Sequence, residues 1–419
     1  MPRINSSEIL CVGTELLLGQ IINTNAAWLA RELSLLGINS YYQTVVGDNP
    51  DRLADALQIA ASRSDLLILT GGLGPTRDDL TMATTAGFFG HSMTIHEPSR
   101  EAILGYFKSI GRHEVTENNW KQALMPDGAI VLPNNNGTAP GAIIETKSPD
   151  GRPMVIIMLP GPPSEMQLMF NESVKPYLIQ QSETRLRHLF VRMIGIGESS
   201  AETRLLDLIE TQQNPTLAPY ASEGEVMFRI TQFCHTDAEP DLTADLLAEV
   251  KNRLGEFIYE VGSRTMPEVV KDLLTEKQMT ISCAESCTGG LVAAAITELP
   301  GSSKVFHGGV IAYDNKVKSS LLGVSTEILH KDGAVSEKCA IAMATGCRDV
   351  LKSDYAIAVT GIAGPGGGSE DKPVGLVWLA VIGPNGIATR KLMLGGNRTR
   401  IRKVATLNAL DLVRRQLLS

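Results

Sequence analysis

Short apolar runs alternate with amphipathic stretches through the first third of the chain. Runs at residues 8–12, 38–46 and 65–70 predict strands, and the apolar spacing at 23–36 and 50–62 predicts helices between them. The run at 65–70 has no polar face, as in a strand that a parallel sheet buries on both sides. This repeated strand–helix unit predicts a doubly wound α/β domain with its binding site at the carboxyl ends of the strands.

The same rhythm returns in the last third. A helix is expected at 266–277, and a strand at 279–283 leads into another helix at 290–299. Further strands are expected at 309–313, 355–360 and 375–382, and further helices at 316–322, 337–351 and from Thr399 onward. We therefore predict a second doubly wound βα domain.

The middle of the chain differs from both ends. A helix at 165–178 leads away from the first domain, and two strands and two helices then alternate. They are expected at 189–194, 200–210, 225–233 and 242–254. The predicted fold is α/β, with domains at 1–170 and 262–419 joined by a small α+β module at 171–258.

Composition agrees with this architecture. The 419 residues exceed one ordinary core, and 39 glycines with only 5% aromatic residues suit an α/β protein with many tight turns. The formal net charge of −8, without a basic motif, disfavours nucleic-acid binding. The six cysteines have no CxxC spacing, so we expect buried thiols in a reducing compartment. We find no signal peptide and no apolar run of membrane-spanning length, and we expect a cytoplasmic protein without membrane contact.

The segment 284–290, AESCTGG, places a serine between a predicted strand and a predicted helix. Backbone N–H groups at such a helix start can stabilise a serine alkoxide or an oxyanion, which makes Ser286 the candidate nucleophile. Gly289 and Gly290 allow a ligand to approach the backbone, and Thr288 is counted with them as a substrate-binding candidate. Position alone favours a helix N-cap role for Ser286, and Thr288 could serve as the cap equally well.

A tyrosine and a lysine occur at the next strand-to-helix junction. Lys318 follows Tyr313 by five residues, at the same edge of the predicted sheet as Ser286. A lysine can act as the base for a serine if desolvation lowers its pKa toward neutrality, and a tyrosine can relay a proton or donate to an oxyanion. The alternative is that Lys316 and Lys318 are ordinary surface lysines.

A glycine-rich loop, TGIAGPGGGS at 360–369, favours the catalytic interpretation. Backbone N–H groups in such a nest bind phosphate, although the loop lacks the GxxxxGK[ST] order of a nucleotide P-loop. The binding candidates here are Thr360, Gly361, Gly364 and Gly366, with positive charge from Lys372 and Arg400 and, as further candidates, Arg398 and Arg402. A nucleophile, a base and a phosphate nest on one sheet predict an amide or ester hydrolase that acts on a phosphorylated small molecule.

The segments ESCTGG, YxNxxK, GAVS, TGIAGPxGG and KPVG resemble, in this order, the C-terminal domain of the competence/damage-inducible CinA family. The resemblance covers nearly all of 262–419. It implies nicotinamide mononucleotide (NMN) deamidase activity, which yields nicotinate mononucleotide and ammonia. By this resemblance Ser286 attacks the carboxamide, Lys318 is the base, Tyr313 assists, and residues 360–368 hold the 5′-phosphate or the ribose. No cofactor is expected for this domain.

The first domain carries paired carboxylates directly after a glycine turn, GGLGPTRDD at 71–79. We expect one of Asp78 and Asp79 to cap the helix that follows and the other to have a functional role. With Glu15 they are candidate ligands for Mg²⁺ or another divalent ion, since such hard cations prefer oxygen ligands. Substrate-binding candidates from the turn and the two loops that complete the pocket are Gly72, Gly74, Thr76, Asn136, Thr138 and Gly161.

The segments GTELLLGQIINTN, GGLGPTRDDLT, NGTAPG and LPGPPSEM resemble the molybdopterin-binding (MoaB/MogA-like) fold, in the version that forms the N-terminal domain of CinA proteins. That resemblance implies a divalent-metal-dependent ADP-ribose pyrophosphatase that yields AMP and ribose 5-phosphate. The middle module is similar to the KH-type linker domain of CinA proteins. Its turn at 195–199, GIGES, departs from the basic GxxG loop that clamps nucleic acid, so we expect a spacer and dimerisation role.

These inferences combine into one expectation, a homodimeric, bifunctional pyridine-nucleotide salvage enzyme that acts on NMN and ADP-ribose. Two alternatives stay open. The first is a deamidase beside a silent, ligand-binding N-terminal domain. The second is a non-catalytic interaction protein of competence or DNA uptake.

Overall fold

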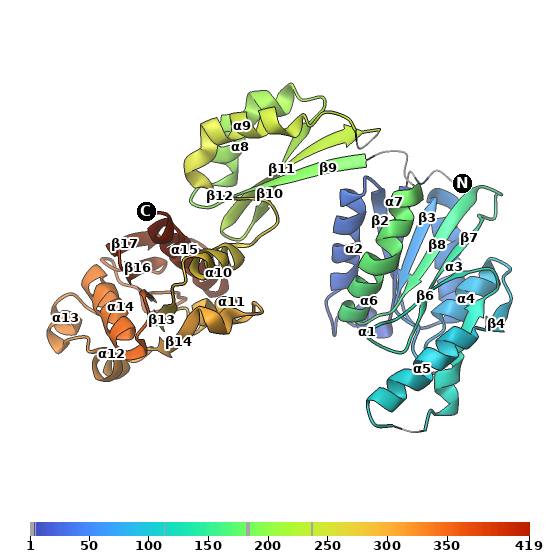
Figure 1. Ribbon diagram of the computed structural model, residues 1–419, viewed down its shortest axis with the longest axis horizontal. Coiled ribbons are helices and arrows are strands. Elements are labelled where there is room, and N and C mark those ends of the chain that lie inside the picture. Colours follow the sequence, from blue (N-terminus) through green and yellow to red (C-terminus); the bar gives the residue numbers. More distant parts are fainter. Residues whose placement is uncertain (1–3, 5, 113, 182–184, 236–237) are drawn as a thin grey trace. The chain divides into compact units, whose positions relative to one another are not determined.

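The computed structural model describes residues 4, 6–112, 114–181, 185–235 and 238–419. The chain forms two compact units, one made of Met1–Leu186 with Phe233–Glu239 and the other of Arg187–Gln232 with Pro240–Ser419. Figure 1 shows the helices and strands of each unit. Within the described part of the chain, none of the helices combines the length and the apolar character that crossing a bilayer requires. The six cysteines are buried free thiols.

The first unit is built on a six-stranded sheet with mixed strand directions. Four parallel strands come first, and two antiparallel strands complete one edge. In spatial order the strands are β2 (Asn39–Val46), β1 (Ser6–Val12), β3 (Leu66–Thr70), β8 (Pro153–Leu159), β7 (Gly141–Lys147) and β6 (Ile130–Leu132). Every residue of β3 is buried, as its unbroken apolar run predicts.

Helices cover both faces of this sheet (Figure 1). One face packs against α2 (Thr24–Leu35), α6 (Pro163–Met169), the π-helical turn η2 (Phe170–Val174) and α7 (Lys175–Gln181). The other face packs against α3 (Pro50–Arg63) and α4 (Thr81–Phe88). The smaller elements of the unit are α1 (Thr14–Leu17), β4 (Met93–Ile95), α5 (Glu97–Ser109), η1 (Glu117–Ala123) and β5 (Leu124–Pro126). Asparagine caps start two of the helices, because Asn23 accepts from the Ala26 N–H and Asn49 from the Arg52 N–H.

The middle module has more strands than the sequence predicts. Its sheet has four strands in the order β10 (Thr216–Ser222), β11 (Glu225–Cys234), β9 (Arg185–Met193) and β12 (Ile258–Val261). They pack with α8 (Glu198–Glu210), α9 (Thr243–Leu254) and the short η3 (Gly255–Phe257). The expected two strands are therefore corrected to four. Pro219 obscures β10 in the sequence, but β10 is an edge strand, where a residue without an N–H is tolerated.

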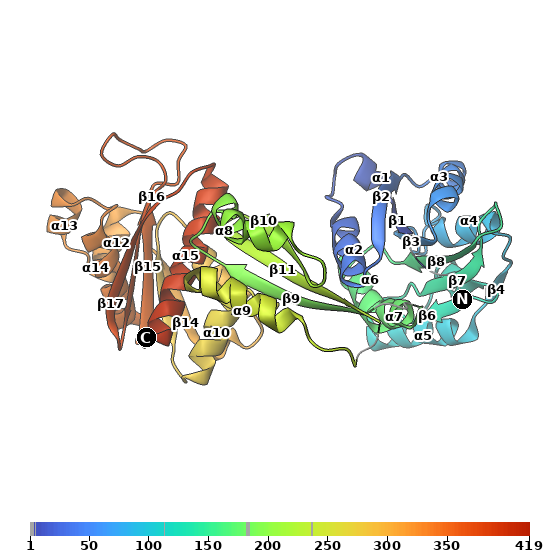
Figure 2. The same ribbon diagram turned by 90° about the horizontal axis from the view of Figure 1, so that it is seen from above.

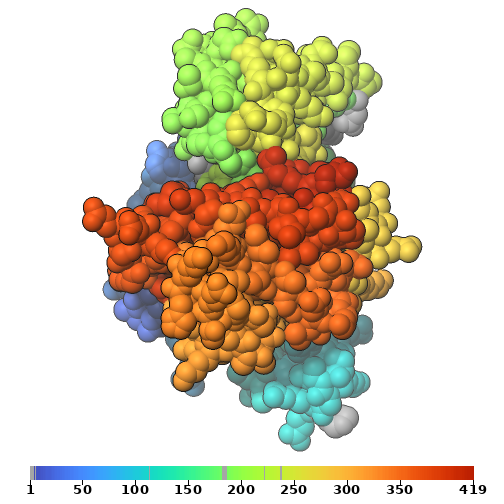
Figure 3. Space-filling model, turned by 90° about the vertical axis from the view of Figure 1, so that its left-hand side faces the viewer, coloured from blue at the N-terminus to red at the C-terminus, as the bar shows by residue number. Residues whose placement is uncertain are grey.

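The turn between β10 and β11 contacts the C-terminal helix α15 (Arg398–Leu418) of the same unit. A Cβ built on Gly224 would lie 3.1 Å from Val404 and 3.2 Å from Leu407, so the turn backbone packs closely on these side chains. Beside them, Glu223 and Lys403 form an ion pair at 3.3 Å. Figure 3 shows the red C-terminal segment at the surface between the yellow-green module and the orange part of the unit.

The C-terminal domain has a five-stranded sheet, again with an antiparallel edge that the sequence analysis did not anticipate. Its strands are β14 (Phe306–Ile311), β13 (Ile281–Glu285), β15 (Tyr355–Gly361), β16 (Leu376–Gly383) and β17 (Gly386–Met393), in this spatial order. One face is covered by α10 (Met266–Glu276), α11 (Leu291–Thr297) and α15. The other is covered by α12 (Asn315–Leu322), α13 (Thr326–Lys331) and α14 (Glu337–Leu351), while η4 (Ser302–Lys304) is a short connection. Figure 2 shows α14 and α15 on opposite sides of the sheet.

The predicted class, two βα domains joined by a small α+β module, is thus confirmed. In both large sheets parallel strands carry candidate loops at their carboxyl ends, whereas the loop with Asn136 and Thr138 connects the antiparallel strands β6 and β7. The antiparallel strands extend each sheet on one side only.

Candidate functional site

Ser286 lies where its motif predicts, directly after β13 and before α11. Its N–H donates to the carbonyl of Val359 in the neighbouring β15, at 2.9 Å. This bond fixes the start of the turn at 286–290 against the sheet. The side chain is buried apart from a small exposed part and faces a cavity at the carboxyl ends of the parallel strands.

Lys318 is buried, only 1% exposed, and its amine meets Ser286. Lys318 Nζ lies 3.3 Å from Ser286 Oγ, 2.8 Å from the carbonyl oxygen of Ala312 and 3.1 Å from that of Tyr313. These three acceptors match the three N–H groups of the protonated amine. In the neutral amine, two N–H groups can still donate to the carbonyls while the lone pair accepts from the serine hydroxyl. Burial lowers the pKa of the Lys318 amine, which favours this neutral form. The pair therefore has the geometry of a nucleophile and its base.

Tyr313 is at the rim of the cavity, and its side chain is 61% exposed. Its hydroxyl accepts a hydrogen bond from Arg398 Nη2 at 3.3 Å, while its backbone carbonyl accepts from Lys318. Tyr313 therefore contacts other residues of the site through its side-chain hydroxyl and through its backbone carbonyl.

The cavity beside Ser286 has a volume of about 260 Å³. Seven predicted residues line it: Ser286, Tyr313, Lys318, Thr360, Gly361, Gly364 and Gly366. Arg398, named above as a further candidate, also lines it, as do Ile362, Ala363 and Gly367 of the expected binding loop at 360–368. The lining residues that were not predicted are Cys287, Asn315, Ala334 and Val335. Ala334 and Val335 belong to the GAVS segment, and Thr360 Oγ1 holds them in place by donating to the Ala334 carbonyl at 2.7 Å.

Five predicted substrate-binding residues are not among the residues that line this cavity: Thr288, Gly289, Gly290, Lys372 and Arg400. Thr288 is fully buried. Lys372 Nζ donates to the Asp332 carbonyl at 2.6 Å, and the Arg400 side chain packs near Gly396. Gly289 and Gly290 have positive φ angles and shape the turn behind the serine.

Arg398 is the arginine that the helix α15 directs into the cavity. Asn397 caps α15 by accepting from the Arg400 N–H, so Arg398 is the first helical residue. Arg398 Nη1 donates to the Gly364 carbonyl at 2.9 Å. The sequence analysis counted Arg400 among the binding residues and Arg398 only among the further candidates, although the Asn397 cap was a usable signal.

The start of α11 is not available to an oxyanion, contrary to our expectation. Glu285 accepts hydrogen bonds from the N–H groups of Gly290, Val292 and Ala293 at 2.9 to 3.1 Å. The Glu285 carboxylate thus takes three of the N–H groups that were expected to stabilise negative charge. Oxyanion donors must come from other groups around the cavity, such as Arg398.

Cys287, beside the serine, is a weaker nucleophile candidate. Burial raises the pKa of its thiol to about 11, so the thiol stays protonated near neutral pH. The lysine contact to Ser286, rather than to this cysteine, agrees with serine as the reacting group.

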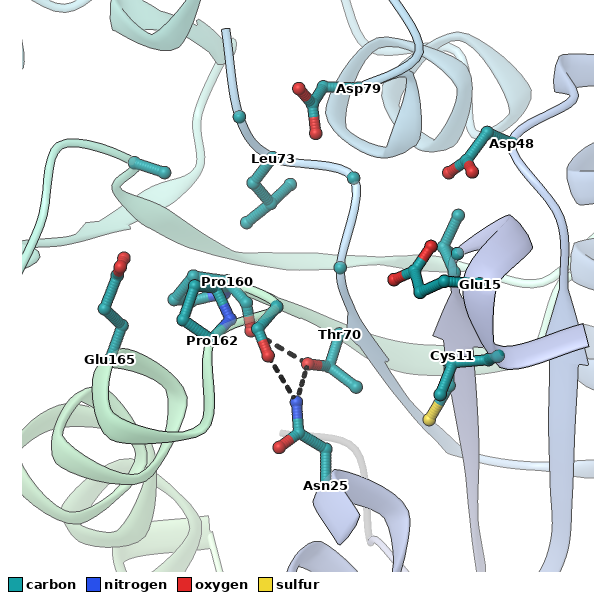
Figure 4. A pocket seen from close by; sticks show the side chains of 18 of the residues that line it. Cys11, Glu15, Asn25, Asp48, Thr70, Leu73, Asp79, Pro160, Pro162 and Glu165 are labelled. Atoms are coloured by element: carbon teal, nitrogen blue, oxygen red, sulfur yellow. Dashed lines mark hydrogen bonds between the residues drawn. The ribbon is translucent and has the colours of Figure 1, made fainter. Parts of the chain in front are cut away.

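The first unit has a larger cavity, of about 690 Å³, at the carboxyl ends of β1, β3 and β8. Its floor is tied together by Asn25, whose amide donates to Thr70 Oγ1 and to the Gly161 carbonyl at 3.0 and 2.7 Å (Figure 4). Sequence reasoning missed Asn25 and Thr70. Of the predicted residues, those that line the cavity are Glu15, Gly72, Gly74, Thr76, Asp78, Asp79, Thr138 and Gly161, whereas Asn136 does not.

Asp79 closes the glycine turn. Its Oδ2 accepts from the Thr76 N–H at 2.8 Å and from Thr76 Oγ1 at 2.6 Å. A Cβ on Gly74 would stand 2.6 Å from the same oxygen, so this position leaves no room for a side chain. Asp79 therefore binds the turn that precedes α4. Neither aspartate caps this helix, because Leu80 is its N-cap and no side chain makes a capping bond, so the expected capping role is corrected. Asp78 is the carboxylate of the pair without a bond to Thr76.

The charges around this cavity have one sign. Five carboxylates line it, and among the described lining residues none is a lysine, arginine or histidine. Figure 4 shows Glu165 on one side, Glu15 and Asp48 on the other, and Asp79 at the top between them. The carboxylates are Glu15, Asp48, Asp78, Asp79 and Glu165.

A divalent ion fits these oxygen donors if the substrate supplies some of its ligands. Among the described residues, no three His, Cys, Asp or Glu side chains gather closely enough to hold a metal ion by themselves. Mg²⁺ is commonly held by one or two carboxylates together with substrate phosphates, without a complete protein cage. The carboxylate oxygens that line different parts of this cavity suit such shared binding of the ion.

Comparison with known proteins places the chain in a family. It is 48% identical to a "CinA-like protein" of Dictyoglomus thermophilum over 413 residues, which covers 98% of this chain and 99% of the relative. It is 46% identical to a "Putative competence-damage inducible protein" of Acetivibrio thermocellus, covering 98% of each chain. The chain belongs to the CinA family.

Three family models match successive parts of the chain. They are the CinA C-terminal domain at 263–417, the probable molybdopterin binding domain at 8–180, and the damage-inducible protein CinA KH domain at 188–259. Among solved structures, the competence/damage inducible protein CihA of Agrobacterium tumefaciens is 41% identical, with a TM-score of 0.35 over 38% of this chain and 99% of its own. The protein CinA of Thermoplasma acidophilum is 32% identical, with a TM-score of 0.37 over 42% of this chain and 98% of its own.

Proposed function

We propose that the C-terminal domain is an amidohydrolase that converts NMN and water to nicotinate mononucleotide and ammonia. The observation that carries the proposal is the buried Lys318 amine, 3.3 Å from Ser286 Oγ and with two carbonyls as its other partners. The CinA membership of the chain supports NMN as the substrate among phosphorylated amides and esters.

The reaction follows from the positions of these groups. Ser286 Oγ attacks the carboxamide carbon while Lys318 accepts the serine proton. Lys318 then passes a proton to the departing nitrogen, which leaves as ammonia, and the acyl group remains as an ester on Ser286. Water attacks this ester with Lys318 again as the base, and nicotinate mononucleotide is released.

The other cavity residues have binding roles in this scheme. Arg398 carries the positive charge at the rim and donates to the loop at Gly364, beside the place where a phosphate or a developing oxyanion would lie. The Tyr313 hydroxyl, held by Arg398, can donate to the same negative charge. The glycine-rich loop permits close approach of the nucleotide to its backbone.

The decisive measurement is ammonia release from NMN by the full-length protein in EDTA. We expect release in the wild type and a loss of about a thousandfold or more in Ser286→Ala, because the nucleophile is removed. Cys287→Ala is the matched control and should keep most of the activity. Full activity of Ser286→Ala would contradict the assignment of the nucleophile.

A second function, cleavage of ADP-ribose to AMP and ribose 5-phosphate, is proposed for the N-terminal domain. The observation that favours it is a cavity that combines ample volume with a wall of carboxylates suited to a divalent ion and a diphosphate. When bound, such an ion would neutralise the diphosphate and polarise its phosphorus–oxygen bonds. Asp78 and Glu15 are the carboxylates most suited to hold it, since Asp79 is engaged by Thr76.

This second proposal is tested by AMP release from ADP-ribose with and without Mg²⁺. We expect release with Mg²⁺, little in EDTA, and no change in Ser286→Ala. Binding without cleavage would favour a silent ligand-binding domain. Loss of both activities, with salt-sensitive retention on DNA, would instead favour the competence-related interaction role that the relatives' names suggest.

A further inference from the structure

The turn that carries Ser286 has no regular secondary structure of its own. Residues 286–290 lie between β13 and α11, and two of them, Gly289 and Gly290, have φ angles of +61° and +100°. Backbone of this kind keeps one shape only if other groups bind its N–H and carbonyl groups. Because Ser286 Oγ must stay beside Lys318 Nζ, the groups that bind the turn matter to the chemistry.

Glu285 binds the N–H side of the turn. The side chain is 1% exposed, and its Oε2 accepts from the Gly290 and Val292 N–H groups at 2.9 and 3.1 Å. Its Oε1 accepts from the Ala293 N–H at 2.9 Å. One carboxylate therefore joins the end of β13 to the first turn of α11 and spans the serine.

Arg402 binds the carbonyl side. From α15, its Nε lies 3.1 Å from the Cys287 carbonyl oxygen, and its Nη2 donates to the Thr288 carbonyl at 2.6 Å. A Cβ on Gly289 would stand 3.3 Å from Arg402 Nη2, so glycine at this position lets the guanidinium come close. The two charged side chains hold the turn from opposite sides.

We propose that Glu285 and Arg402 are positioning residues that set Ser286 Oγ against Lys318 Nζ. This inference rests on the proposed role of Ser286 as nucleophile. Neither side chain is among the described residues that line the cavity, so neither is proposed to touch the substrate. Their effect should appear in the rate of nucleophilic attack and not in substrate affinity.

The test compares Glu285→Gln and Arg402→Lys with Lys403→Gln, a control on the same helix with an exposed side chain. Glutamine keeps the size of Glu285 but turns an N–H₂ group toward N–H donors, and lysine replaces the guanidinium fork by a single ammonium. We expect Glu285→Gln to lower kcat for NMN about a hundredfold with KM largely unchanged, as for a misplaced reacting group. Arg402→Lys should lower kcat less than Glu285→Gln does, and Arg402→Met should lower kcat more than Arg402→Lys does.

A second readout does not depend on NMN. A fluorophosphonate labels an activated serine by forming a phosphorus–oxygen bond to Ser286, with loss of fluoride and transfer of the serine proton to Lys318. The labelling rate should fall in parallel with kcat in both variants and stay at the wild-type value in Lys403→Gln. If Glu285→Gln does not fold, the two Arg402 variants carry the test.

The outcomes separate the two proposals. Unchanged kcat and labelling in Glu285→Gln and Arg402→Lys, even with a lower melting temperature, would overturn the positioning role. So would a wild type that the probe does not label. A wild type that is labelled but releases no ammonia from NMN would overturn the proposed substrate, and the labelling rates of the variants would still decide the role of the turn.

Discussion

At the scale of single residues, the environment of Lys318 predicts the pH dependence of the proposed deamidation. Burial lowers the pKa of this amine from its ordinary value of 10.5. The amine must be neutral to accept the serine proton, so kcat/KM for NMN should rise with pH and level off below pH 10.5. A pH–rate profile measures this directly. A rate that keeps rising until the ordinary lysine pKa is reached would contradict a desolvated base.

The same lowered pKa predicts how stability changes with pH. Between the lowered folded-state pKa and 10.5 the unfolded chain binds the proton and the folded protein does not, so the free energy of unfolding rises with pH in this window. In Lys318→Met this contribution is absent. From the lower to the upper end of this window, the free energy of unfolding of the wild type should increase relative to that of the variant. The increase should be about 1.4 kcal/mol for each unit by which the pKa is lowered. Urea unfolding of both proteins at several pH values would measure this increase. The same pH dependence of the free energy of unfolding in both proteins would contradict it.

Individual residues also show which parts of the candidate site can be predicted from the sequence. Ser286 and Lys318 could be predicted because strand ends in a parallel sheet bring distant motifs to one edge. The choice between Arg398 and Arg400 depended on the residue at which α15 begins, and helix starts are hard to place from sequence alone. The capture of the α11 N–H groups by Glu285 depends on side-chain direction at the end of a strand, which the apolar pattern does not encode.

At the scale of elements, the contact between α12 and α14 should influence the position of the base. Gly346 in α14 faces the last turn of α12, where a methyl group would overlap the carbonyl of Leu322. Gly346→Ala should push away the helix that carries Lys318, costing about 1–3 kcal/mol of stability, with a fall in kcat. Thermal unfolding and NMN turnover test this expectation.

The matched control is a helical glycine in open space. Gly105 in α5 has nothing within 4 Å of an added Cβ, so Gly105→Ala should stabilise the protein by about 0.5–1 kcal/mol and leave deamidation unchanged. Equal effects of the two substitutions would show that the α12–α14 contact is not tight. The sequence pattern does not distinguish these two glycines, because the difference lies in tertiary packing.

Element by element, the sequence analysis succeeded where apolar runs were long and buried. The strands β3 and β15 have unbroken apolar patterns and lie in the middle of their sheets. The strands β4, β5, β6, β7, β10, β12 and β17 were missed. β17 is half exposed and β6 is only three residues long, so their patterns resemble those of loops.

At the scale of the whole molecule, the charge of the N-terminal cavity predicts a coupling between cation and substrate. Five carboxylates repel a free diphosphate, and no basic side chain among the described lining residues offsets them. An α,β-methylene analogue of ADP-ribose should therefore bind at least about tenfold more tightly with Mg²⁺ than in EDTA, and by linkage Mg²⁺ should bind more tightly with the analogue. Titration calorimetry in both orders measures the coupling. Equal affinity with and without Mg²⁺ would contradict it.

The contact of the β10–β11 turn with α15 has a practical consequence for solubility. A protein shortened to residues 262–419 would lose Glu223 and Gly224 and leave Val404 and Leu407 facing water, beside an unpaired Lys403. Newly exposed apolar side chains on a helix favour self-association, so the shortened protein should aggregate at concentrations that the intact chain tolerates. Polar residues at positions 404 and 407 should restore a monodisperse solution, and the catalytic groups would be untouched.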